Sequence, residues 1–261
     1  MSEMPEINSY SSTRPIRWAE GDPNELLTLN VALLLPPQIR SESLKRSRHF
    51  AILMQQAGLD SQFVLGESVP WGSERAEPHT SIFMLSVPRT MIPRLASALD
   101  RVAMSISPVD VVGERYAHNP FGAPEIYFRR TPQWHVLQGA VVTAFEPFRE
   151  GRVRPTGPFG EPLRAMLAGA VAAEPERLQQ LRQTGYDEIG GRFNPHITEA
   201  APTDPSFHVS FDTSPEPASV AGTLTTLALY RMGPYGTCLT NYHRAELHGP
   251  PRVIDHRRDD H

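Results

Sequence analysis

The first half of the chain alternates short apolar runs with amphipathic segments. Residues 29–35 read LNVALLL and end at two prolines, which is typical of a buried strand followed by a helix over about 37–57. Residues 80–87, TSIFMLSV, predict a stronger strand, and a shorter one is expected over 62–65. Apolar residues three or four apart over 91–104 predict a helix with one buried face. The main order is therefore strand, helix, strand, helix.

The second half repeats this order with insertions. The pattern predicts a helix over 133–145, a Gly-, Pro- and Arg-rich loop over 147–162 and a further helix over 163–183. The expected strands of this half occupy 109–112, 125–128, 194–200, 224–231 and 242–247. The first two flank an NPFG turn and the last two are joined by GPYGT, so each couple is expected to form a strand pair.

Composition limits the class of protein. The chain has 261 residues, of which 39% are hydrophobic, enough for one sizeable core or two small lobes. No run approaches the ~18 apolar residues of a membrane helix and no basic-then-apolar leader is present, so a cytoplasmic location is expected. Polar stretches over 1–25 and 251–261 predict a flexible arm and a disordered tail around a body over 26–250. The lone Cys238 favours an ordinary residue over a nucleophile.

The distribution of charge bears on the partner. The formal net charge is −4, and residues 1–25 hold two arginines against five acidic residues, or −3, while 251–261 sum to zero. The body therefore carries −4 + 3 = −1. Proteins that grip long nucleic acids usually present a net basic surface, because counterion release supplies much of their affinity. A small nucleotide or an RNA end is the expected partner, rather than a long DNA duplex or a membrane.

Two histidines stand in matching local sequences. The chain has no HExxH, P-loop, GxGxxG or GxSxG motif. Residues 77–83 read EPHTSIF and residues 194–200 read NPHITEA, so His79 and His196 each follow a proline and precede a hydroxyl residue by two positions. His208 also fits His-x-Ser but lacks the proline, and it stays open as an alternative second member.

The His-x-[ST] spacing has a chemical meaning on a strand. Side chains two residues apart project from the same face, so His79 would lie beside Ser81 and His196 beside Thr198. Imidazole has an ordinary pKa near 6.5, so one histidine can take a proton while the other donates one to a leaving oxygen. The hydroxyls can hydrogen-bond phosphoryl oxygens. Paired acid–base catalysis on a phosphodiester is therefore predicted, with no metal or other cofactor.

These motifs resemble those of a known superfamily. The segments LNVALLLPP, PHTSIF, RFNPHIT and LTTLALYRMGPYG are similar to the two-histidine phosphoesterases, which include bacterial RNA 2′,5′-ligase-like proteins and cyclic phosphodiesterases. The similarity covers roughly residues 29–248. It implies an α+β fold of two pseudo-symmetric lobes, each an antiparallel sheet with outer helices, and a cleft between the sheets.

The resemblance also implies roles for single residues. His79 and His196 would be the catalytic pair, and Ser81 and Thr198 would bind the substrate phosphate. Two departures from the family pattern are Thr80, at an apolar position of the first motif, and Glu199, after Thr198 in the second. Two further candidates for substrate contact are Arg192, four residues before His196, and Tyr230, whose aromatic ring could stack on a base.

The expected activity is metal-independent hydrolysis of a 2′,3′-cyclic phosphate, a 2′,5′ linkage or a cyclic nucleotide. One alternative is a ligase-like enzyme of the same fold that joins RNA ends through a 2′,5′ bond. Another is a nucleotide- or RNA-binding module that has lost turnover, against which the two intact His-x-[ST] motifs argue. The residues alone do not decide which histidine is the acid and which is the base.

Overall fold

Two four-stranded antiparallel sheets organise the chain. The computed structural model describes residue 22 and residues 24–249, so most of the expected N-terminal arm and all of the expected C-terminal tail lie outside the described residues. The first sheet has the order β2-β1-β7-β8 and the second the order β5-β4-β3-β6. The strands are β1 Leu26–Leu34, β2 His79–Pro88, β3 Val109–His118, β4 Pro124–Phe128, β5 His196–Thr198, β6 Ala221–Leu224, β7 Thr226–Met232 and β8 Cys238–Glu246. The predicted α+β fold with two antiparallel sheets is confirmed.

In the part of the chain that the structure describes, five α-helices and five short 3₁₀ turns lie between the strands. The helices are α1 Pro37–Gln56, α2 Ile92–Ser105, α3 Pro132–Phe145, α4 Leu163–Leu167 and α5 Pro175–Thr184 within the described residues. The 3₁₀ turns there are η1 Arg89–Met91, η2 Glu146–Arg149, η3 Gly190–Arg192, η4 Pro217–Ser219 and η5 Pro234–Gly236. Proline opens the first turn of α1, α2, α3 and α5, where its missing N–H costs no helix bond. No helix in the described part of the chain is long and apolar enough to cross a bilayer.

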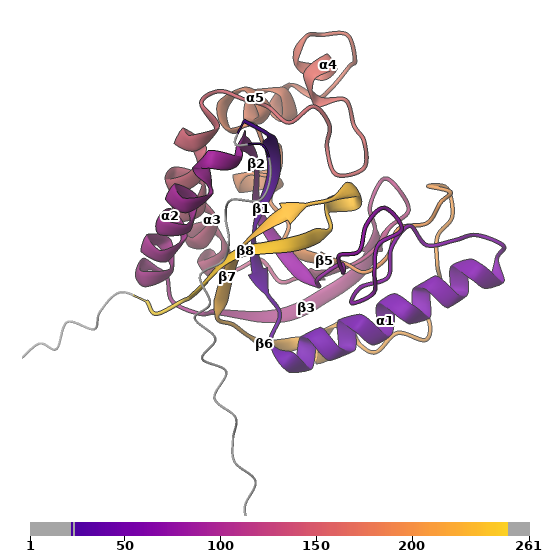
Figure 1. Ribbon diagram of the computed structural model, residues 1–261. Helices are drawn as coiled ribbons and strands as arrows, with labels where there is room; N and C mark the ends of the chain where they lie inside the picture. Colours follow the sequence, from indigo (N-terminus) through magenta and orange to yellow (C-terminus); the bar gives the residue numbers. More distant parts are fainter. Residues whose placement is uncertain (1–21, 23, 250–261) are drawn as a thin grey trace, which may run out of the picture.

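The helices are divided between the sheets. Helices α2 and α3 pack together, and α2 lies on β7 and β8 of the first sheet. Helix α1 follows β1 in sequence but lies along the second sheet (Figure 1), where the Ile39 side chain fills the space over Gly222 of β6. The chain therefore crosses between the lobes directly after its first strand.

A buried ion pair fastens α1 to β5. Arg46 of α1 donates to both carboxylate oxygens of Glu199, at 2.8 and 2.6 Å, and Ser43 donates to the same group at 3.1 Å. The side chains of Arg46 and Glu199 are 5% and 0% exposed. Burying a carboxylate is tolerable only when its lone pairs are satisfied, as they are here. Glu199, directly after β5, thus has a structural partner on the helix that covers its own sheet.

Two predicted elements differ from the structure. Residues 62–65 form no strand: the Gln62 N–H donates to the carbonyl of Ala201, and the Leu65 N–H donates to the hydroxyl of Ser47. The predicted helix over 163–183 is two helices, because Gly169 adopts a φ of +75° after α4 and Pro175 begins α5. The other predicted strands and helices are present, with ends that differ by up to six residues. Residues 109–112 pair with β6, and the expected pairing with β4 is made by the continuation of β3 to His118.

Candidate active site

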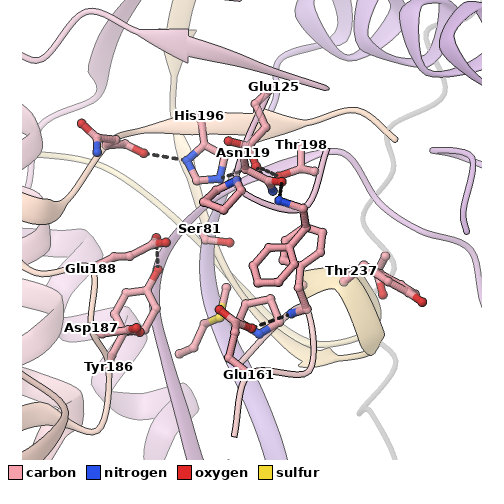
Figure 2. A pocket seen from close by; sticks show the side chains of 18 of the residues that line it. Ser81, Asn119, Glu125, Glu161, Tyr186, Asp187, Glu188, His196, Thr198 and Thr237 are labelled. Atoms are coloured by element: carbon pink, nitrogen blue, oxygen red, sulfur yellow. Dashed lines mark hydrogen bonds and ion pairs between the residues drawn. The ribbon is translucent and has the colours of Figure 1, made fainter. Parts of the chain in front are cut away.

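Both His-x-[ST] motifs open into one pocket. His79 and Ser81 lie on β2 at the edge of the first sheet, and His196 and Thr198 lie on β5 at the edge of the second. All four side chains line a single pocket of about 490 Å³. Figure 2 shows Ser81 across from His196 and Thr198. Residues 117 positions apart in the sequence (196 − 79) therefore meet between the two sheets.

A β-bulge in β2 sets which side chains face this pocket. Ala32 of β1 is paired with Ser81 and Val31 with Phe83, so Ile82 is an extra residue in the ladder. Ile82 and Phe83 can both enter the core, where each is 0% exposed. Beyond the bulge the alternation is shifted by one, and Met84 lines the pocket together with Ser81. The bulge thus keeps the histidine and the hydroxyl on the pocket face without leaving the core unfilled.

Backbone carbonyls orient the two imidazoles in the same way. His79 Nδ1 lies 2.8 Å from the carbonyl oxygen of Glu77, and His196 Nδ1 lies 2.7 Å from that of Asn194. A carbonyl only accepts, so Nδ1 of each ring carries the proton. In both lobes the Nε2 atom is therefore the one that exchanges a proton. The proline before each histidine sits between it and the carbonyl that holds it.

The group that meets Nε2 differs between the lobes. Asn30 of β1 places its amide Nδ2 3.3 Å from His79 Nε2 and 2.8 Å from Ser81 Oγ. In the other lobe the carboxylate of Glu125, on β4, lies 3.7 Å from His196 Nε2 and accepts the Thr198 hydroxyl at 3.0 Å. Glu125 and Thr198 lie close to His196 in Figure 2. An uncharged donor thus faces one histidine, and an anion faces the other.

These neighbours separate the proton affinities of the two rings. Burial, followed by the nearby charge of His196, lowers the pKa of His79. Burial also acts to lower the pKa of His196, but the carboxylates of Glu125 and Glu188 outweigh it, and that pKa is raised. His196 therefore keeps its second proton to a higher pH than His79 does.

Glu125 is held by hydrogen-bond donors. Its side chain is 3% exposed and accepts from Asn119 Nδ2 at 2.9 Å, from the Thr198 hydroxyl and from the Tyr127 hydroxyl. Burial and the charge of Glu125 raise the pKa of Tyr127, so its hydroxyl stays protonated and remains a donor. Three donors on one carboxylate fix its position beside His196.

The remaining pocket walls are aromatic and acidic. The aromatic residues that line the pocket are Phe63, Phe121, Tyr127, Phe159, Tyr186 and Tyr235. Phe121 and Phe159 stack with ring centroids 4.8 Å apart, and Phe159 meets Tyr235 edge-on at 5.9 Å. Tyr235 has a φ of +59°, and its N–H donates to the carbonyl of Pro158 at 2.7 Å, which joins the β7–β8 turn to the loop after η2. Three separate segments therefore close this side of the pocket.

No family model and no curated protein matches the sequence. Among solved structures, the fold is similar to that of E. coli LigT. The structure of LigT complexed with 3′-AMP is 16% identical over 85% of this chain and 99% of that one, with a TM-score of 0.46. A phosphoesterase is also 16% identical, over 85% and 98% of the two chains, with a TM-score of 0.47. Kluyveromyces marxianus Usb1 with uridine monophosphate is 10% identical over 84% and 98%, with a TM-score of 0.36.

The other candidates from the sequence lie in different surroundings. Arg192 lines the pocket, but its guanidinium donates to the Asp187 carbonyl and pairs with Glu174 at 2.6 Å. Tyr230 is 2% exposed, packs in a cluster on the first sheet and is not part of the pocket lining. The structure brings Arg192 to the site and does not bring Tyr230 there.

Two other residues raised by the sequence also lie apart from the histidine pair. The ring of His208 stacks on His118 with centroids 4.5 Å apart, and His208 does not line the pocket. Cys238 is buried and accepts a hydrogen bond from Asn30, and burial raises its pKa well above the ordinary value, so it remains a thiol. In residue 22 and residues 24–249, no group of three or more His, Cys, Asp and Glu side chains is placed to hold a metal ion.

Sequence reasoning missed the residues that distinguish the two histidines. Asn30 interrupts the apolar run LTLNVALLL, and Glu125 interrupts APEIYF. A polar residue inside a buried strand needs a partner and marks a position to inspect. The local pattern holds that signal, but it does not reveal that the partner lies 49 or 73 residues away.

Proposed function

We propose that this chain is a two-histidine phosphoesterase that hydrolyses phosphodiester bonds of nucleotides or RNA ends by acid–base catalysis. One observation carries the proposal: two histidines from opposing sheets present Nε2 to a common pocket, each with Nδ1 bound to a backbone carbonyl and a hydroxyl two residues further on. A general base and a general acid on opposite sides of one phosphorus atom are what in-line displacement requires.

The neighbours of each histidine support one role for it. His79, neutral beside the Asn30 amide, takes the proton from an attacking water, whose oxygen forms the new bond to phosphorus. The bond from phosphorus to the 2′ or 3′ oxygen breaks, and the His196 imidazolium donates its Nε2 proton to that oxygen. One water is consumed and a phosphomonoester is released. Solvent then returns both histidines to their starting protonation states.

The hydroxyls are unequal as phosphate ligands. Asn30 donates to Ser81 Oγ, so the Ser81 proton is free for a non-bridging phosphoryl oxygen. The Thr198 proton is already donated to Glu125 and must turn away from that carboxylate to reach a phosphate. Ser81 is therefore the stronger phosphate donor of the two. The aromatic side chains around Phe159 supply apolar faces against which a nucleobase can rest.

The test is turnover by purified protein treated with EDTA. The panel contains 2′,3′-cyclic nucleotides, 2′,5′-linked dinucleotides and cyclic dinucleotides, with His79→Ala and His196→Ala as variants. We expect a phosphomonoester product from wild type in the presence of EDTA and a loss of at least about 10³-fold in each variant, since each removes one proton-transfer partner. Undiminished activity in either variant contradicts the mechanism.

Two further measurements separate the alternatives. RNA halves that carry a 2′,3′-cyclic phosphate and a 5′-hydroxyl are joined by a ligase-like enzyme and merely opened by a hydrolase. Tight nucleotide binding that survives both alanine substitutions, without product from wild type, identifies a binding module instead.

A further inference from the structure

Carboxylates outnumber cationic side chains in the pocket. The carboxylates that line it are Glu125, Glu161, Asp187 and Glu188, and the arginines are Arg177 and Arg192. Figure 2 shows Glu161, Asp187 and Glu188 along the wall away from Thr198. A pocket for a substrate with several phosphates would be expected to show the opposite balance.

Both arginines of the lining are already engaged. Arg177 pairs with Asp187 at 2.5 Å and with Glu161 at 3.2 Å. Arg192 pairs with Glu174 at 2.6 Å and donates to the Asp187 carbonyl at 3.1 Å. Either guanidinium would have to leave a carboxylate before it could meet a second phosphate.

A third arginine lies behind the wall. Arg154 is 1% exposed, with its guanidinium carbon 5.6 Å from the centre of the Tyr186 ring and Nη1 3.5 Å from Met84 Sδ. Tyr186 and Met84 line the pocket, whereas Arg154 does not. The positive charge of Arg154 offsets part of the negative charge of the acidic wall. Its guanidinium N–H groups do not line the pocket and cannot hydrogen-bond a ligand there. The His196 imidazolium remains the cation that a phosphate can touch.

We propose, on the basis of the proposed function, that the preferred substrate carries its only negative charge on the reacting phosphodiester. A nucleoside 2′,3′-cyclic phosphate without a 5′-phosphate has this property. The 3′ end of an RNA strand does not, because each further phosphodiester adds a negative charge near a pocket lined by the carboxylates of Glu161, Asp187 and Glu188. The acidic wall therefore selects a mononucleotide over an RNA end.

The test compares three substrates that share the reacting group. They are adenosine 2′,3′-cyclic phosphate, the same compound with a 5′-phosphate, and the dinucleotide ApA ending in a 2′,3′-cyclic phosphate. We expect each added phosphate to lower kcat/KM by roughly tenfold or more at about 0.02 M salt, because partly buried like charges repel strongly. The difference in kcat/KM between the substrates should be smaller at about 0.5 M salt, because salt screens the repulsion.

Two variants test whether the acidic wall causes the difference in kcat/KM between the substrates. Glu188→Gln removes a charge from the wall and keeps an oxygen to accept the Tyr186 hydroxyl. Glu174→Gln releases Arg192, and its side chain is 72% exposed, so the fold is not at risk. Both should raise the relative kcat/KM of the 5′-phosphorylated substrate at least threefold. Glu67→Gln, which removes an exposed partner of Arg48 outside the pocket, is the matched control and should leave the ratio unchanged.

The outcomes of the two proposals are distinguishable. Equal or faster turnover of the 5′-phosphorylated compound or of the dinucleotide overturns the substrate inference and leaves the phosphoesterase proposal standing. The substrate inference is also overturned if neither Glu174→Gln nor Glu188→Gln reduces the difference in kcat/KM between the substrates. In that case the acidic wall is not the cause of the difference. Absence of turnover on all three substrates overturns this inference, and the proposed hydrolysis falls with it when the 2′,5′-linked and cyclic dinucleotides are not hydrolysed either.

Discussion

Replacing Glu125 with glutamine tests the assignment of His196 as the acid. The substitution keeps the size of the side chain and removes the charge that lies 3.7 Å from His196 Nε2. Unit charges about 4 Å apart attract by about 4 kcal/mol at an effective dielectric constant of ~20. The amide dipole of glutamine retains part of this attraction, and solvent screens the His196 imidazole, which is 20% exposed. We therefore expect the imidazolium to lose roughly 1–3 kcal/mol of stabilisation.

The loss should appear on one side of the pH profile. Removing the carboxylate lowers the pKa of His196, so the imidazolium is lost at lower pH and the basic limb of kcat/KM moves down. Each ~1.36 kcal/mol is worth a factor of ten, so activity near pH 8 should fall roughly 10- to 100-fold, while the acidic limb, which reports His79, stays in place. The assay is kcat/KM for a 2′,3′-cyclic nucleotide between about pH 5 and 9.

Tyr127→Phe is the matched control for this experiment. It removes a hydroxyl that donates to Glu125 and leaves the carboxylate charged, so the basic limb should remain or move to higher pH. Thermal unfolding of both variants checks that they are folded. A basic limb that does not move in Glu125→Gln, or an acidic limb that moves instead, would refute the assignment.

Three further predictions follow from the same contacts. Asn30→Asp places a carboxylate beside the first histidine and raises its pKa, so kcat/KM near pH 6 should fall about tenfold and change little near pH 8; an unmoved acidic limb contradicts this. Ser81→Ala should lower kcat/KM roughly 10- to 100-fold, more than Thr198→Val does, and the reverse order contradicts the donor assignment. Arg46→Ala should cost about 3–5 kcal/mol of unfolding free energy in urea, whereas Arg46→Met with Glu199→Leu should recover most of it.

Local pattern determined most of the elements and the pairing within each motif. The apolar run of β1, the prolines at the helix starts and the glycines of the β7–β8 turn act through neighbours in sequence, so their effects can be predicted without the fold. The same holds for His79 with Ser81 and for His196 with Thr198, since a period of two puts them on one strand face. The helix over 163–183 was mispredicted because the break around Gly169 outweighs the helix formers on either side.

The tertiary structure decided the difference between the two halves of the site. Sheet register places Asn30 beside His79 and Glu125 beside His196, and the bulge at Ile82 sets which side of β2 faces the pocket. Register and bulges depend on contacts between distant strands, so no local period encodes them. The two motifs are nearly alike in sequence. They differ in proton affinity because one faces an amide and the other a carboxylate, each contributed by a neighbouring strand.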